Sequence, residues 1–126
     1  MAANCEKTVS DLFAAWTRIN LDEIMTYFTA DAVWDNVPMN APAKGTAAIR
    51  EMTQGFLKDM TSFDVKLLKT LHVGNVLVNE RVDTVVMKNG KKAAIPVVGV
   101  FELNDAGKIT VWRDYFDLGT FTKQVS

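Results

Sequence analysis

The hydrophobic pattern of this chain changes period once, near residue 62, and that change limits the folds open to it. Before this point apolar residues recur at helical spacing, most clearly at Val9, Leu12, Phe13, Trp16 and Ile19. After it, segments such as FDVKLLKTLHVG and NVLVNERVDTVVM alternate with period two, which is typical of strands. Helices followed by strands predict an α+β fold, in which the helices cover one face of a curved, mixed but largely antiparallel sheet.

Local signals place the helices. The apolar spacing predicts a first helix at about residues 4–19, and Asn20 with Glu23 forms a cap pair that opens a short second helix in LDEIMTYF. Thr46 is the expected N-cap of a third helix, which has an apolar side formed by Ile49, Met52, Phe56 and Leu57.

Turn residues place the strands. TADAVWDNVP predicts a turn and a short strand ended by Pro38, and KNGK predicts a hairpin tip. Pro96 predicts a bulge or an edge in the strand KAAIPVVGVFEL, because proline cannot donate a ladder hydrogen bond. ITVWRDYF is the last expected strand, and a short tail follows it.

Composition indicates a single domain over residues 1–126. Hydrophobic residues make up 48% of the chain and charged residues 23%, as in ordinary globular proteins. The net charge of −1 provides no basic surface for nucleic acid or for an anionic membrane. Cys5 is the one cysteine, so we expect no disulfide and no metal cluster. The charges in MAANCEKTVSDL and the lack of a long apolar segment argue against a signal peptide and a transmembrane helix, which predicts a cytoplasmic protein.

Three pairs of residues, each two positions apart on a predicted strand, carry polar groups that share a face with their partner. The pairs are Trp34 with Asn36, Arg81 with Asp83, and Trp112 with Asp114. If the three faces converge under the helices, they form a pocket with two carboxylates, a guanidinium, an amide and indole walls. Two carboxylates in a dry pocket cannot both ionise at low cost, so one would serve as a general acid and the other as a general base. Such a site could open a strained ether with water in one step.

Each of these residues also has a common structural role. An Arg–Asp pair on one strand is more often a surface contact, and the tryptophans are more often core. Asn36, just before Val37-Pro38, could start a turn, and Asp114 could lie at the end of its strand. Spacing alone therefore leaves a catalytic site as the minority hypothesis.

Four segments, VWDNVP, ERVD, GVFEL and GKITVWRDYFDL, occur in this order and resemble the limonene-1,2-epoxide hydrolase family. That family lies within the group that shares the cone-shaped, nuclear-transport-factor-2-like (SnoaL-like) fold. The resemblance runs from the first helix to Phe121. It implies an enzyme without cofactor or metal that hydrolyses a small apolar epoxide, cyclic or terpene-like, to a vicinal diol, and it implies a homodimer.

The resemblance also implies a role for each site residue. Asp83 would donate a proton to the epoxide oxygen, and Asp114 would take a proton from water. Arg81 would link the two carboxylates, and Asn36 would hold the water. The family has a tyrosine as a third water ligand where this chain has Trp34, whose indole N–H can donate to the water but cannot accept from it.

Two other functions remain open at this point. An isomerase of the ketosteroid type also uses an Asp base, with hydrogen-bond donors at an enolate oxygen, but it needs no arginine between two carboxylates. A non-catalytic binding module would need only the apolar cavity, because one fold can support many functions.

Overall fold

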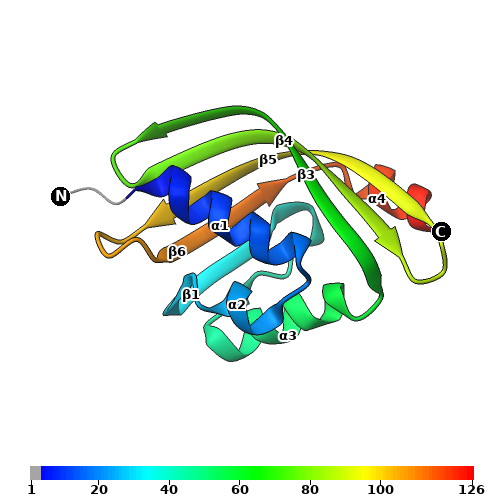
Figure 1. The fold of residues 1–126 in the computed structure, drawn as a ribbon, viewed down its shortest axis with the longest axis horizontal. Helices are drawn as coiled ribbons and strands as arrows, with labels where there is room; N and C mark the ends of the chain where they lie inside the picture. Colours follow the sequence, from blue (N-terminus) through cyan, green and yellow to red (C-terminus); the bar gives the residue numbers. More distant parts are fainter. Residues whose placement is uncertain (1–3) are drawn as a thin grey trace.

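The computed structural model describes residues 4–126, which form one curved sheet with helices packed against it (Figure 1). The strands are β1 (Phe28–Asn36), β2 (Ala43–Lys44), β3 (Met60–Val73), β4 (Val76–Met87), β5 (Lys92–Leu103) and β6 (Ile109–Tyr115). The helices are α1 (Cys5–Thr17), α2 (Leu21–Met25), α3 (Thr46–Leu57) and α4 (Leu118–Val125), with a 3₁₀ turn η1 (Val37–Met39) after β1. No helix within residues 4–126 is both long enough and apolar enough to cross a membrane.

The six strands lie in the order β2-β1-β6-β5-β4-β3. Within the described residues, neighbouring strands pair antiparallel except β1 and β6, which run parallel. The prediction of a mixed, largely antiparallel α+β fold is therefore confirmed. The long strands β3, β4 and β5 bend across the molecule, and α1 lies along the face that they enclose (Figure 1).

The core fills the space between α1 and the sheet. Leu12, Phe13 and Trp16 are buried on the inner side of α1, as the helical spacing predicts. Phe13 packs edge-on against Trp112 at 5.8 Å between ring centroids, and Trp16 packs edge-on against Trp34 at 5.7 Å. Aromatic contacts of this kind join the first helix to β1 and β6.

The cap of the second helix is as predicted, whereas the cap of the third is not. Oδ1 of Asn20 accepts from the backbone N–H of Glu23 at 3.1 Å. In α3 the N-cap is Gly45, with φ at +86°, so no side chain at the N-cap accepts a hydrogen bond from the first turn of this helix. Glycine adopts this φ without steric cost, so Thr46 already lies inside the helix and its hydroxyl donates to the carbonyl of Ala30 at 3.3 Å.

The tail after the last strand differs from the prediction, since it folds as α4. Asp117 caps this helix by accepting from the N–H of Gly119 at 3.0 Å. Phe121 and Val125, one helical turn apart, pack on a cluster formed by Ala93, Ile95 and Val97 of β5. This contact buries the apolar side of α4 and explains why the tail is ordered.

Two strand predictions also have clear outcomes. The first strand is longer than expected, because Phe28 already pairs with Ile109 of β6 and the preceding helix ends at Met25. Pro96 occupies an edge: β6 stops at Tyr115, opposite Val98, so residues 92–97 of β5 pair with β4 alone. The edge predicted from Pro96 is confirmed.

Candidate active site

Two rows of register partners across four strands bring the site residues together. One row consists of Asn79 on β4, Gly99 on β5, Asp114 on β6 and Asn36 on β1. The next row consists of Leu77, Phe101, Trp112 and Trp34 on the same strands. The parallel register of β1 and β6 aligns the two tryptophans, which stack at 4.7 Å between centroids. These rows bring two of the three predicted polar pairs, Trp34 with Asn36 and Trp112 with Asp114, side by side, and the third pair, Arg81 with Asp83, reaches them through the guanidinium.

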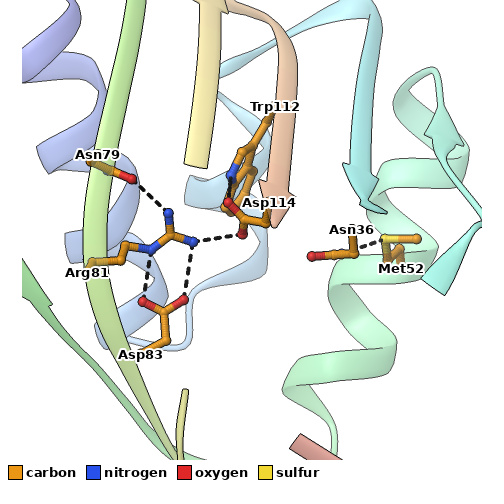
Figure 2. Close-up of polar contacts among 7 residues, drawn as sticks. All are labelled: Asn36, Met52, Asn79, Arg81, Asp83, Trp112 and Asp114. Carbon is orange, nitrogen blue, oxygen red and sulfur yellow. Dashed lines mark hydrogen bonds and ion pairs between the residues drawn. The ribbon is translucent and has the colours of Figure 1, made fainter. Parts of the chain in front are cut away.

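Arg81 joins the two carboxylates directly. Its Nε donates to Oδ1 of Asp83 at 2.9 Å, and Nη2 contacts Oδ2 of the same carboxylate at 3.2 Å. Nη2 also donates to Oδ2 of Asp114 at 2.7 Å, across 33 residues of sequence (Figure 2). A planar guanidinium fits this arrangement because its donors lie in a rigid fork.

The guanidinium is fully enclosed. The side chain of Arg81 is 0% exposed, against 14% for Asp83 and 7% for Asp114. Phe13 of α1 covers the guanidinium, with Cζ 4.7 Å from the ring centroid, a cation–π contact. Gly99 leaves room beneath it, because a Cβ at this position would lie 2.4 Å from Nη1 of Arg81.

Burial shifts the ionisation of both carboxylates. Desolvation raises the pKa of Asp83 from its ordinary 3.8 to about 6, against the opposing effect of the Arg81 charge. Desolvation also raises the pKa of Asp114, opposed by Arg81 and by the hydrogen bond from Trp112. In both residues the buried environment thus favours the protonated carboxyl group, which is what a general acid needs, and Arg81 opposes this effect, which favours an ionised base.

The remaining predicted residues surround Asp114. Nε1 of Trp112 donates to Oδ1 of Asp114 at 2.7 Å, which fixes that carboxylate from its second side. Asn36 is buried, and its Nδ2 points to Sδ of Met52 at 3.6 Å. Figure 2 shows the amide oxygen of Asn36 on the side that faces Asp114. The amide and the carboxylate both line the same cavity.

Trp34 acts as a wall in this structure. Its ring lies between Trp112, Trp16 and Phe56. Its Nε1 is buried and has no hydrogen-bond partner among residues 4–126. The indole therefore contributes apolar surface to the site and an unused donor.

A cavity of about 200 Å³ opens in front of the carboxylates. Its polar lining residues are Asn36, Asp83, Asp114 and Thr122, and the rest of its wall is apolar. That wall includes Phe13, Trp16, Trp34, Phe56, Phe63, Trp112, Phe116 and Phe121, together with Met39, Met60 and Met87. A dry apolar cavity of about 150 Å³ accommodates benzene, so this one has room for a single ring with a small substituent.

No group of three or more His, Cys, Asp or Glu side chains suited to holding a metal ion is present within residues 4–126. The sequence patterns did not predict that Asn79 and Gly99 belong to the site. They also did not predict that Trp112 donates a hydrogen bond to Asp114. Asn79 lies two positions before Arg81 on the same strand, so extending the same spacing by one step would have found it.

The sequence of this chain matches a family of known proteins. Residues 3–126 match the family described as the limonene-1,2-epoxide hydrolase catalytic domain. The chain belongs to the limonene-1,2-epoxide hydrolase family. A curated relative, epoxide hydrolase EphG of Mycobacterium tuberculosis, is 34% identical over 90 residues, which are 70% of this chain and 56% of that protein. The chain thus matches little more than half the length of this relative.

Solved structures agree with this family and with the fold. The structure of an LEH-like epoxide hydrolase from M. tuberculosis has a TM-score of 0.80 at 26% identity, covering 94% of this chain and 87% of that one. A SnoaL-like protein from Shewanella denitrificans has a TM-score of 0.86 at 19% identity, covering 95% of each chain, and shows the shared fold. The resemblance on which the sequence prediction depended is confirmed.

Proposed function

We propose that this limonene-1,2-epoxide hydrolase family member adds water to a small apolar epoxide and releases a vicinal diol. The observation that carries the proposal is the buried guanidinium of Arg81, which bonds the carboxylates of Asp83 and Asp114 at 2.7–3.2 Å beside an apolar cavity. An isomerase needs no such bridge between two carboxylates, and a binding module needs no carboxylates with raised pKa values.

The reaction takes one step in this proposal. Protonated Asp83 donates to the epoxide oxygen as one C–O bond breaks. Ionised Asp114 takes a proton from water as the water oxygen forms the new C–O bond to carbon. The product is the diol, Asp83 has lost its proton to the diol oxygen, Asp114 has gained a proton from the water, and exchange with solvent restores the starting state. Proton transfer at each end of such a step contributes about 10²–10⁴ in rate.

Asn36 and Asp114 hold the water in this proposal. They are register partners on adjacent parallel strands, and the amide can accept one hydrogen of the water while the carboxylate accepts the other. A water held by both groups directs its remaining lone pairs toward the cavity. Trp34 forms the wall of the cavity beside this water.

The size and lining of the cavity support a one-ring or compact terpene-like epoxide. The cavity has a volume of about 200 Å³ and a mostly apolar wall, which keeps bulk water away from the substrate and strengthens the charge interactions at the carboxylates. Met39, Met60 and Met87 add flexible apolar side chains to the wall, which suits substrates of differing shape.

We also propose that the protein works as a homodimer through the outer face of the sheet. Apolar side chains that alternate with the pocket-facing ones are exposed there: Leu71 63%, Val73 85%, Val76 40%, Val98 40% and Tyr115 46%. Val98 and Tyr115 are register partners on neighbouring strands, so these two side chains lie next to each other on this face. A second copy of the chain would bury this apolar surface. Light scattering should give a mass in solution of twice the mass of one chain, and Val98→Lys should reduce this mass to that of a single chain.

A panel of epoxides tests the proposed activity. Cyclohexene oxide, limonene oxide, styrene oxide and a linear alkene oxide are incubated with the enzyme, and diols are separated by chiral chromatography. We expect diol from at least one cyclic epoxide, in enantiomeric excess, and none with Asp114→Asn. Diol formation that persists in Asp114→Asn, or its absence with every epoxide, would contradict the proposal.

A further inference from the structure

Asn79 holds the third corner of the Arg81 guanidinium. The two residues are two positions apart on β4 and share the inner face of the sheet. Nη1 of Arg81 donates to Oδ1 of Asn79 at 2.8 Å, and the two residues are 0% and 1% exposed. Figure 2 shows Asn79 and Asp83 on opposite sides of the guanidinium, with Asp114 at its remaining end. The guanidinium is thus bonded on all three of its nitrogens.

Gly99 lets the guanidinium occupy this position. It is the register partner of both Asn79 on one side and Asp114 on the other. A Cβ at Gly99 would lie 2.9 Å from Oδ1 of Asn79 and 2.8 Å from Oδ1 of Asp114, besides its clash with Arg81. Arg81 therefore lies over the bare backbone of β5, between an amide and a carboxylate.

The neutrality of Asn79 matters for the charges around Arg81. Its carbonyl accepts a hydrogen bond without adding charge to the one cation and two carboxylates. A third carboxylate here would compete for Arg81 and would raise the pKa of both Asp83 and Asp114. An aliphatic side chain would leave a buried N–H of the guanidinium without its acceptor. An amide is the side chain that orients Arg81 and leaves the charge balance unchanged.

Asn79 is not among the residues that line the reaction pocket. It lines a second cavity, of about 370 Å³, together with residues of α1 and β3. Phe13 lines both cavities and covers Arg81. The titratable groups on this side are Glu6 of α1 and Asp64 of β3, both exposed. The neutral amide of Asn79 therefore acts on the reaction through its bond to Arg81.

We propose that Asn79 is a positioning residue, which fixes the guanidinium of Arg81 between Asp83 and Asp114 and thereby sets how these two carboxylates ionise. This inference rests on the proposed function for its kinetic consequences, but the ionisation itself is measurable without turnover. Because Asn79 lies outside the reaction pocket, substitutions of Asn79 change the orientation of Arg81 without changing the side chains that line the pocket.

The test compares Asn79→Asp and Asn79→Leu with a matched control, Thr53→Val. Thr53 is also fully buried, and its hydroxyl bonds the carbonyl of Ile49 inside α3, away from Arg81. Carboxyl carbons of Asp83 and Asp114 are titrated by NMR in each protein, and kcat and KM are measured across pH. All proteins are compared by circular dichroism and thermal unfolding.

We expect Asn79→Asp to raise both carboxyl pKa values by about one unit or more, because it places an anion beside the pair. The base must be ionised and the acid protonated, so both limbs of the kcat profile should move to higher pH. Asn79→Leu should lower kcat by about tenfold or more and leave KM within about twofold, because the substrate pocket is unchanged. Thr53→Val should leave titrations and profile as in the unmodified protein.

Unchanged titrations and unchanged pH limbs in Asn79→Asp, with the fold intact, would overturn the inference. If the titrations move as expected but no protein makes diol, the positioning inference stands and the proposed function fails. If diol forms in all proteins and only thermal stability changes, Asn79 has a structural role alone. Because Asn79→Asp keeps the shape of the side chain, it remains informative even if Asn79→Leu does not fold.

Discussion

Gly99 and Arg81 lie in contact across the sheet, with the guanidinium of Arg81 in the space that a side chain at position 99 would fill. A Cβ there would lie 2.4 Å from Nη1 of Arg81, which is closer than Cβ atoms come to any neighbour. Gly99 has no backbone need to be glycine, since its φ is not in the left-handed region. Glycine at position 99 is therefore explained by the room that Arg81 needs in the site and not by the backbone conformation of a turn.

The first prediction is that Gly99→Ala removes activity while the protein still folds. The added methyl must displace the end of Arg81, which breaks its contacts with both carboxylates, and we expect a loss of about a hundredfold or more in kcat/KM. Gly55→Ala is the matched control, because nothing lies within 4 Å of a Cβ at Gly55 in α3. Steady-state kinetics and thermal unfolding of both variants make the comparison. Equal activity in the two variants would show that Arg81 tolerates displacement.

Asp83→Asn and Asp114→Asn should each reduce hydrolysis by about a thousandfold or more, because each removes one end of the proton transfer. The amide keeps the size of the side chain, so the fold should persist. Turnover with the best epoxide and far-ultraviolet circular dichroism provide the measurement. A variant that keeps a tenth of the activity would remove that aspartate from the chemical step.

Much of this site could be predicted from spacing and from the family resemblance, but not all of it. Arg81, Asp83 and Asp114 meet as expected, because alternation along a strand fixes which face each side chain takes. Gly99 was not predictable in the same way, because its role depends on the register between β4, β5 and β6, which a single strand does not reveal. The wrong cap at Thr46 reflects a positive φ at Gly45 that tertiary packing imposes.

The tail shows a different kind of limit. Asp117 and the four-residue spacing of Phe121 and Val125 are signals for a helix, yet a segment of eight residues is not stable as an isolated helix. Its order comes from packing on Ile95 and Val97 of β5. Only the position of β5 beside the tail, which is a property of the whole sheet, turns a weak local pattern into α4.

The pH dependence of stability should carry the signature of Asp83. Its pKa is about 6 in the folded protein against an ordinary 3.8, so the folded state binds the proton more tightly than the unfolded one. Its contribution is complete below about pH 4 and is lost as the pH rises through about 6. Urea unfolding between pH 4 and pH 7 should therefore show a smaller fall in stability for Asp83→Asn than for the unmodified protein. Identical slopes for the two proteins would contradict this ionisation.

Trp34→Phe should change the rate by less than about threefold. A neutral hydrogen bond is worth about 0.5–1.5 kcal/mol, but Nε1 of Trp34 makes none with residues 4–126, and phenylalanine keeps most of the apolar wall. Asn36→Ala should cost more than about tenfold, because it removes the amide that faces Asp114. The turnover of both variants on one epoxide gives the comparison. A loss in Trp34→Phe as large as that in Asp114→Asn would make the indole an essential ligand of the water.

In the proposed reaction, water activated by Asp114 attacks the epoxide directly while Asp83 donates its proton. Single turnover in water enriched in ¹⁸O, with enzyme in excess over epoxide, distinguishes this attack from one by a carboxylate of the enzyme. Mass spectrometry of the diol and of peptides that contain Asp83 or Asp114 follows the label. We expect one labelled oxygen in the diol and none in either aspartate. Label in the carboxylate of Asp83 or Asp114, with an unlabelled diol from the first turnover, would contradict it, because that result requires a covalent ester with the enzyme.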